Sequence, residues 1–166
     1  MKKECFEDFL SAHEKRIFRY LVGLTNNEHD AMDLVQAVFI AIYEKFESIE
    51  EPTALSYTYR VAHNKAMTFL KKRSRYINVD PASFRDVLKA PVPSVETDYT
   101  FLHLALKELP PRMAAVVQLQ YFEQLSYKEI AERLGISVKA VESLLVRAKR
   151  GLRKKISQGN KETMVL

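Results

Sequence analysis

Residues 125–155 contain the capping residues, the turn and the run of cations that a DNA-recognising pair of helices needs. Ser126 and Glu129 stand three residues apart, which is the register of a capping box at a helix start. Gly135 can adopt the left-handed conformation that ends this helix, and Ser137 can cap the next one. A short turn of this kind holds two helices at a steep crossing, so that the second can enter a major groove.

The outward face of the second helix becomes more basic along its length. Val141, Leu145 and Ala148 recur at helical spacing and mark the buried side. No acidic residue occurs from position 143 to 158. The start of the helix therefore suits contacts with bases, and its more basic later turns suit contacts with phosphates. An ordinary helical corner is the alternative interpretation. The residues that we expect to contact DNA are Ser137, Lys139, Glu142, Ser143, Arg147 and Arg150.

A second face suited to nucleic acid is predicted on a helix over residues 52–75. Winding this segment at 100° per residue places cations, an amide and an aromatic ring on one solvent stripe, opposite Ala62 and Phe69. Arginine and lysine bind phosphates, whereas exposed tyrosine and asparagine can recognise unstacked bases of a single strand. A plain solvated face is the alternative. The stripe consists of Tyr57, Arg60, Asn64, Thr68, Lys71 and Arg75.

The helix predicted over residues 28–46 carries a different surface. Its inward residues run from Ala31 to Phe46, and its solvent side combines acidic and amide groups with an apolar residue in the middle. This mixture on an otherwise basic chain favours a protein-binding surface over a nucleic-acid-binding one. The surface consists of Asp33, Gln36, Ala37, Ile40 and Glu44.

The elements that position these faces are all helical, because the chain has four glycines and no alternating β-branched runs bounded by turns. A first helix with an apolar stripe from Phe6 to Leu24 ends at Asn26 and Asn27. We expect an all-α fold of two small helical domains joined by a flexible linker. The expected divisions are residues 1–76, a linker over 77–98 marked by three prolines, residues 99–158, and a disordered tail over 159–166.

Composition narrows the class of protein. The 166 residues carry a net charge of +5, which favours polyanionic partners, and 47% are hydrophobic, which suffices for real cores. Cys5 is the only cysteine, and acidic residues interrupt every apolar run near the N-terminus, so we expect a cytoplasmic protein without a signal peptide. Four scattered histidines and the lack of any catalytic motif predict a non-enzyme without metal or cofactor.

Three ordered segments resemble extracytoplasmic-function (ECF) sigma factors of the sigma-70 family. The run DAMDLVQAVFIAIYEKF (30–46) resembles their region 2.2, and YTYRVAHNKAMTFLKKRSR (57–75) resembles regions 2.3 to 2.4. The run that begins LPPRMAAVVQLQYFEQLSYKEIAERLGISVKAVESLL, within residues 109–154, resembles regions 4.1 to 4.2. A helix-turn-helix alone is a weak signal, whereas three ordered segments at this spacing are a strong one.

The resemblance implies a promoter-specificity subunit of RNA polymerase. The second helix would bind the clamp helices of the largest polymerase subunit, and the second domain would bind the minus-thirty-five element while its other face meets the flap. An anti-sigma factor is a further expected partner. The residues implied in polymerase binding are Asp33, Gln36, Phe39 and Ile40. Those implied in binding and melting the minus-ten element are Tyr57, Tyr59, Arg60, Asn64, Lys71 and Arg75.

The alternative function is a helix-turn-helix repressor or activator whose N-terminal helices form a sensor domain. The second DNA-compatible face and the lack of an obvious dimerisation helix argue against this alternative. Within the helix-turn-helix, Leu144 lies about 60° from the centre of the buried stripe and is expected at the edge of the core.

Overall fold

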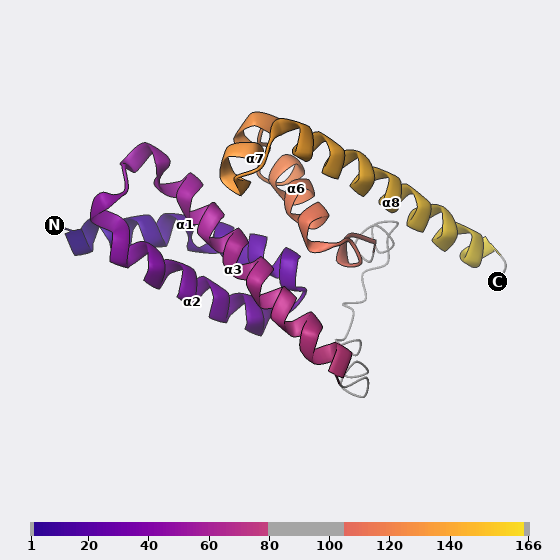
Figure 1. Cartoon of the computed structure of the whole chain (residues 1–166), viewed down its shortest axis with the longest axis horizontal. Helices are drawn as coiled ribbons and strands as arrows, with labels where there is room; N and C mark the ends of the chain where they lie inside the picture. Colours follow the sequence, from indigo (N-terminus) through magenta and orange to yellow (C-terminus); the bar gives the residue numbers. More distant parts are fainter. Residues whose placement is uncertain (1, 80–104, 165–166) are drawn as a thin grey trace.

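The computed structural model describes residues 2–79 and 105–164, and within these ranges it contains helices and no strand, as the sequence predicts. Figure 1 shows α1, α2 and α3 as one group and α6, α7 and α8 as a second group beside α3. The elements are α1 (Lys2–Thr25), α2 (Glu28–Lys45), the short 3-10 helix η1 (Phe46–Ser48), α3 (Glu51–Val79), α6 (Pro111–Tyr121), α7 (Tyr127–Leu134) and α8 (Val138–Met164).

The first group, here called the first module, is held by the apolar stripes expected of its three helices. The predicted inward residues of α2 between Ala31 and Ile42 are all buried. Ile17 of α1 and Tyr59 of α3 are fully buried against them. Burial of apolar side chains is the main stabilising contribution to a bundle of this kind, at roughly 1.5–3 kcal/mol for each large residue.

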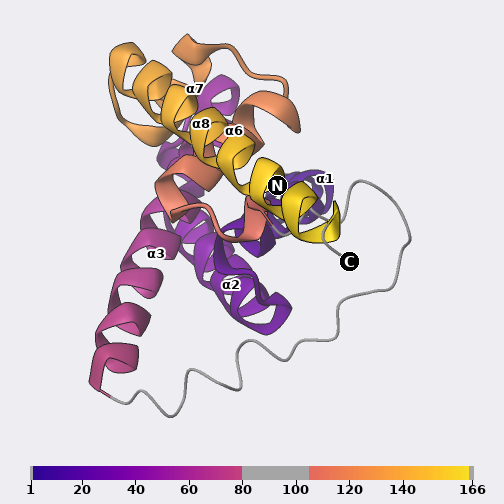
Figure 2. The same ribbon diagram turned by 90° about the vertical axis from the view of Figure 1, so that its right-hand side faces the viewer.

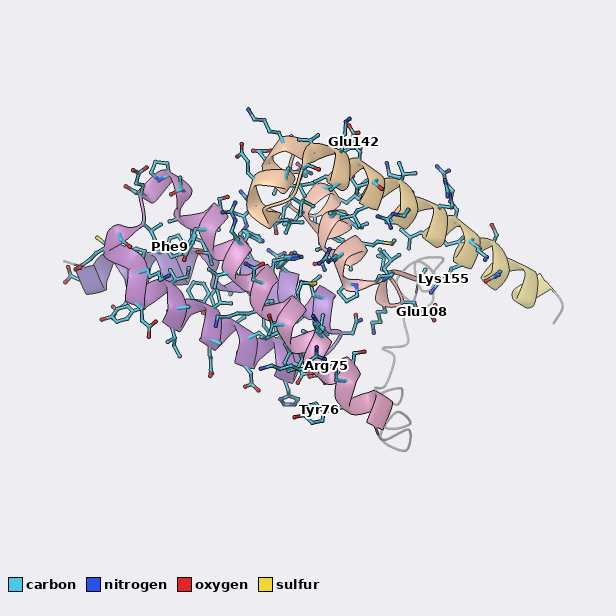
Figure 3. The ribbon with its side chains drawn as sticks, in the orientation of Figure 1. Phe9, Arg75, Tyr76, Glu108, Glu142 and Lys155 are labelled. Carbon is cyan, nitrogen blue, oxygen red and sulfur yellow. The ribbon has the colours of Figure 1, made fainter. Side chains whose placement is uncertain are left out.

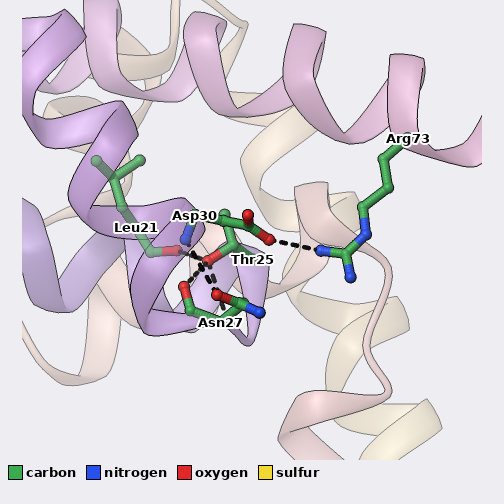
Figure 4. A network of polar contacts seen from close by, with 5 residues as sticks. All are labelled: Leu21, Thr25, Asn27, Asp30 and Arg73. Atoms are coloured by element: carbon green, nitrogen blue, oxygen red, sulfur yellow. Dashed lines mark hydrogen bonds and ion pairs between the residues drawn. The ribbon is translucent and has the colours of Figure 1, made fainter. Parts of the chain in front are cut away.

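The corner between α1 and α2 is fixed by polar contacts (Figure 4). Asn26 adopts the left-handed conformation with φ of 53°, and Asn27 caps α2 by accepting a hydrogen bond of 3.0 Å from the Asp30 backbone N–H. The Thr25 hydroxyl donates to the Asn27 carbonyl at 3.0 Å. Arg73 of α3 donates to the Asp30 carboxylate at 2.7 Å, so the same corner also forms an ion pair with the third helix.

The second group, here called the second module, has the predicted helix-turn-helix geometry. Ser126 and Glu129 form both bonds of the capping box, and Gly135 ends α7 with φ of 68°. The Ser137 hydroxyl caps α8 by accepting from the Ala140 backbone N–H at 3.1 Å. Leu145, in the first third of α8, is buried, and Leu144 is half-buried at the core edge, as expected.

The two modules pack against each other. Both α6 and α7 lie along the first module, with α6 against α1 and α7 against α3, while α6 also contacts α8 on its other side (Figures 1 and 2). Gly23 of α1 permits a close approach, because a methyl group at this position would stand 1.9 Å from Nε2 of Gln118. The buried residues of both modules therefore join into one apolar core.

Two expected boundaries differ in the structure. The third helix continues to Val79, three residues into the expected linker, and the rest of the linker lies outside the described residues, as do positions 101–104. The last helix continues to Met164, whereas a tail was expected from residue 159. Gly159 alone does not end it, since an interior glycine costs only about 1 kcal/mol and no proline follows.

No helix in the described part of the chain combines the length and the apolar composition that a membrane span requires.

Two glycines provide a matched test of the helix-turn-helix. Gly135→Ala should lower the free energy of unfolding by about 1 kcal/mol, because an alanine is strained at positive φ although its Cβ would have space. Gly151→Ala should raise it by up to about 1 kcal/mol, because this glycine lies inside α8 with 3.9 Å to its nearest neighbour. Urea unfolding of both variants measures the difference, and equal effects would contradict the assigned turn geometry.

Candidate nucleic-acid interface

The outward face of α8 presents the residues predicted to contact DNA. Apart from Ser137, whose hydroxyl caps the helix, they project from its first half, and Glu142 points away from α3 (Figure 3). The described side chains on this face carry several cations and one carboxylate, in the arrangement of a recognition helix. The exposed residues are Lys139, Glu142, Ser143, Arg147 and Arg150.

The predicted stripe on α3 is mostly open to solvent. Arg60, Asn64, Lys71 and Arg75 are exposed, and Tyr57 is half-buried. Tyr59 differs from the others because it is fully buried. In this conformation the Tyr59 ring is therefore a core side chain that cannot contact a DNA base.

The cover over Tyr59 comes from the second module. The guanidinium of Arg133, near the end of α7, lies 4.8 Å from the centroid of the Tyr59 ring, within the range of a cation–π interaction. Tyr20 of α1 packs edge-on against the same ring at 5.3 Å. Arg60, one residue further along α3, donates a hydrogen bond to the backbone carbonyl of Glu132. Two of the residues expected at the minus-ten element are thus engaged by α7.

The remaining part of the α3 stripe faces α8 across a cleft of about 580 Å³. Asn64 and Thr68 line the cleft from α3, and Ser143 and Arg147 line it from α8. The fold therefore brings together two faces that the sequence placed on separate domains. The other lining residues are His63, Met67, Arg112, Leu134, Ile136, Ala140 and Leu144.

His63 lies at the inner end of this cleft and is buried. Its Nδ1 is 3.0 Å from the Tyr20 hydroxyl. Burial and the nearby positive charge of Arg112 lower the pKa of His63 to about 4, so the imidazole is neutral at pH 7. Burial also raises the pKa of Tyr59 to about 12, with a further contribution from the carboxylate of Glu123.

The solvent face of α2 lies on a different side of the first module. Asp33 and Gln36 are exposed, and 62% of the Ile40 surface is open to solvent. Phe39 is buried, but it forms a wall of an apolar groove of about 370 Å³ between α1 and α2. Exposed apolar groups beside a groove are typical of a protein-binding surface. The groove is lined by Phe6, Leu10, Glu14, Val35, Gln36, Phe39, Ile40 and Tyr43.

Sequence reasoning did not identify the residues that join the modules. Arg16 of α1 forms an ion pair with Glu123, which follows α6, through bonds of 3.1 Å from Nε and 2.5 Å from Nη2. Arg133 has no special spacing in its helix, and its role depends on the position of Tyr59. No signal in the sequence could have found these contacts, because each partner lies in a different module. Within the described residues no histidine, cysteine and carboxylate side chains cluster as a metal site would require.

Both modules match models of known protein families. Residues 9–76 match the family model described as sigma-70 region 2, and residues 102–152 match sigma-70 region 4. The two matches follow the order and positions of the two helical groups. The chain belongs to the sigma-70 family, and its relatives place it among the ECF RNA polymerase sigma factors.

Two relatives illustrate the extent of similarity. The RNA polymerase sigma factor SigV of Bacillus subtilis is 30% identical over 142 residues, which cover 84% of this chain and 83% of SigV. The ECF RNA polymerase sigma factor SigE of Mycolicibacterium smegmatis is 29% identical over 165 residues, or 95% of this chain. The chain spans only 64% of the length of that SigE protein.

Solved structures share the fold. The sigma factor RpoE of Bartonella quintana, crystallised with the anti-sigma factor NepR, superposes with a TM-score of 0.73 and is 19% identical. That match covers 93% of this chain and 98% of RpoE. CnrH, solved with the cytosolic domain of CnrY, superposes with a TM-score of 0.65 at 21% identity and covers 94% of this chain and 90% of CnrH.

The two buried tyrosines should respond differently to loss of the hydroxyl. Tyr59→Phe should leave the free energy of unfolding unchanged within about 0.5 kcal/mol, because the buried Tyr59 hydroxyl has Glu123 and Arg16 near it but forms no hydrogen bond of good geometry. Tyr20→Phe should lower it by about 1–3 kcal/mol, because it removes the partner of buried His63. Urea unfolding at pH 7.5 measures both values. A larger loss for Tyr59→Phe than for Tyr20→Phe would contradict this geometry.

Proposed function

We propose that the chain directs core RNA polymerase to a set of promoters and helps to open them. The observation that carries this proposal is the match of sigma-70 regions 2 and 4, in order, to the two modules of the structure. As a sigma factor the chain acts in transcription initiation, and the polymerase performs the catalysis. It therefore works in the cytoplasm, where the polymerase is.

The stripe on α3 is the proposed site for the minus-ten element. Arg60, Lys71 and Arg75 are exposed cations along one face, where they can bind backbone phosphates. Asn64 lies between them and can form hydrogen bonds with an unstacked base. Tyr57 is half-buried, so only part of its ring is open for stacking on a base. Tyr59 would become accessible only if α7 left α3.

The face of α8 is the proposed site for the minus-thirty-five element. Lys139, Glu142 and Ser143 lie near the start of the helix, where side chains of a recognition helix contact base edges. Arg147 and Arg150 follow one and two turns later and suit the phosphate backbone.

The groove beside α2 is the proposed contact with the clamp helices of the largest polymerase subunit. Ile40 and the wall formed by Phe39 provide apolar area, and Asp33 and Gln36 provide polar contacts at the rim. The other face of the second module would meet the polymerase flap. By analogy with RpoE, which was crystallised with the anti-sigma factor NepR, we also propose an anti-sigma partner for this chain.

Transcription in vitro with purified core polymerase over a promoter library tests this function. Initiation should depend on the added chain and should select templates with a shared pair of elements. A helix-turn-helix repressor would instead bind a palindromic site tightly without polymerase. Promoter selection identical with and without the chain would refute the proposed function.

Charge reversal tests the stripe on α3. The double variant Arg60→Glu, Lys71→Glu should lose open-complex formation, and the slope of log affinity against log salt should fall by about 1.4 if both residues contact single-strand phosphates. The control, Lys15→Glu with Arg19→Glu, makes the same charge change at exposed positions on α1. Permanganate footprinting across a salt series measures opening, and equal behaviour of both double variants would contradict a role for the stripe.

A single substitution tests base recognition by α8. Glu142→Lys should change the preferred minus-thirty-five sequence, because a carboxylate accepts from cytosine whereas a lysine donates to guanine. Each altered base contact should shift discrimination by about 1–3 kcal/mol. Selection from a randomised duplex library measures the preference, with Glu7→Lys on α1 as the control. A uniform gain in affinity for all sequences would show that Glu142 is only a surface charge.

A further inference from the structure

We propose that the cleft between α3 and α8 binds a small organic phosphate, a molecule with a phosphate group at one end and an apolar body at the other. The cleft is a hollow between helices, whereas the faces assigned above are open surfaces. Arg112 of α6, which has no part in the proposed function, lines it. The binding does not depend on the proposed function, and only its effect on promoter DNA rests on that function.

The cleft has the size of a small-molecule site. Its volume of about 580 Å³ lies within the range of roughly 300–1,000 Å³ that is usual for such sites. Residues of α3, α6, α7 and α8 form its walls, so a ligand would be surrounded on several sides. A DNA duplex, whose major groove alone admits a whole α-helix, is too wide to enter this space. The cleft is therefore distinct from the outward face of α8.

The charged groups of the cleft favour an anion. Arg112 contributes from α6 and Arg147 from α8, and none of the described lining residues carries a carboxylate. Neither arginine forms an ion pair with another described residue. Positive charges that share a cleft without a counter-ion repel each other, so an anion bound between them is stabilised by both.

His63 adds to this environment at the inner end of the cleft. Burial and the charge of Arg112 lower the pKa of His63 to about 4, and no described carboxylate opposes this effect. The positive charge of Arg112 therefore acts on the inner end of the cleft without being offset. Nδ1 of His63 is 3.0 Å from the Tyr20 hydroxyl, so Nε2 is the ring nitrogen that a ligand could contact.

The number of donors favours a phosphate over a carboxylate. Each arginine presents a planar set of N–H donors that can bind two oxygens of one anion. Asn64, Thr68 and Ser143 add an amide and two hydroxyls to the walls of the cleft. A phosphate monoester has more acceptor oxygens than a carboxylate and a charge of about −1.5 to −2 at pH 7. It can therefore satisfy more of these donors.

The remaining wall suits the apolar body of the ligand. Its side chains come from α3, α7, α8 and the turn before α8, and none of them carries a charge. Small-molecule sites commonly combine such a wall with a few converging polar groups. An inorganic phosphate would leave this wall in contact with water, so an organic phosphate binds with an advantage over it. The wall consists of Met67, Leu134, Ile136, Ala140 and Leu144.

A bound ligand would compete with promoter DNA. Asn64 belongs to the stripe proposed for the minus-ten element, and Ser143 and Arg147 belong to the face proposed for the minus-thirty-five element. A ligand that occupies these groups makes them unavailable to DNA, so ligand and promoter would exclude each other. Promoter binding would thus respond to the concentration of a phosphorylated metabolite.

Isothermal titration calorimetry with the full-length chain tests the site. The probes are adenosine monophosphate and phenyl phosphate, which both carry a phosphate and an aromatic group. At least one should bind with one-to-one stoichiometry. Adenosine, inorganic phosphate and glucose 6-phosphate should each bind at least about tenfold more weakly, because each lacks either the phosphate or the apolar body. Absence of binding by both probes, or equal binding of adenosine and adenosine monophosphate, would overturn the proposal.

Substitution of the two arginines locates the binding. Arg112→Gln and Arg147→Gln should each weaken binding of the probe by about tenfold or more, because each removes charge-assisted hydrogen bonds. Arg153→Gln makes the same change at an exposed position of α8 outside the cleft and should have no effect. Circular dichroism confirms that each variant is folded. Equal losses in all three variants would reveal a general attraction of anions and would overturn the site.

An acidic segment of a protein is the alternative anion for this cleft. Hexa-aspartate is titrated under the same conditions and should bind more weakly than the better phosphate probe. If it binds more tightly than both probes, and if the same two arginine substitutions abolish its binding, the cleft is a site for an acidic protein segment and the proposal is wrong.

Fluorescence anisotropy of a labelled promoter, with the chain and core polymerase, tests the competition. Saturating adenosine monophosphate should lower promoter binding, and adenosine should not. Promoter binding that is unchanged by the phosphate would overturn the competition, whereas calorimetry decides the site. Absence of promoter binding without any ligand would count against the proposed function alone.

Discussion

The ring of Tyr59 is the interaction on which the arrangement of the chain depends. Tyr20 packs against its edge from within the first module, and Arg133 covers its face from the second. A buried aromatic ring of this size contributes more than any single polar contact around it. Since the ring belongs to α3, the helix proposed to bind the minus-ten element, the packing that completes the core also covers part of the DNA-binding face. The same surface cannot serve both purposes at once.

The polar contacts between the two modules are individually weak. A cation–π contact contributes about 0.5–2 kcal/mol, and a partly exposed ion pair such as Arg16 with Glu123 contributes a similar amount or less. The Tyr59 hydroxyl and Nη1 of Arg133 are buried without hydrogen bonds of good geometry, which offsets part of this stabilisation. The two modules share one apolar core, so their separation would also expose apolar side chains to water.

Local features of the fold were predictable because their causes are local. Ser126 with Glu129, the left-handed Gly135 and the cap at Ser137 follow from spacing and residue type, and the structure confirms all three. The resemblance placed Tyr59 at the minus-ten element, and no pattern in the sequence predicted its cover by α7. Arg133 and Glu123 contact residues that are far away in the sequence, Arg16 being 107 positions before Glu123, and no periodicity encodes such contacts. The end of α8 was also wrongly placed, because Gly159 is too weak a helix breaker to override good helix formers.

The most direct test of the account is a nuclear Overhauser measurement on the free full-length chain in solution at pH 7.5. Cross-peaks between the ring protons of Tyr59 and those of Tyr20 report the first module alone and serve as the internal reference. The account predicts additional cross-peaks between the Tyr59 ring and the side chain of Arg133, which lie in contact in the structure. Strong cross-peaks within the first module with none to Arg133 would contradict it, because the two modules would then be apart before any partner binds.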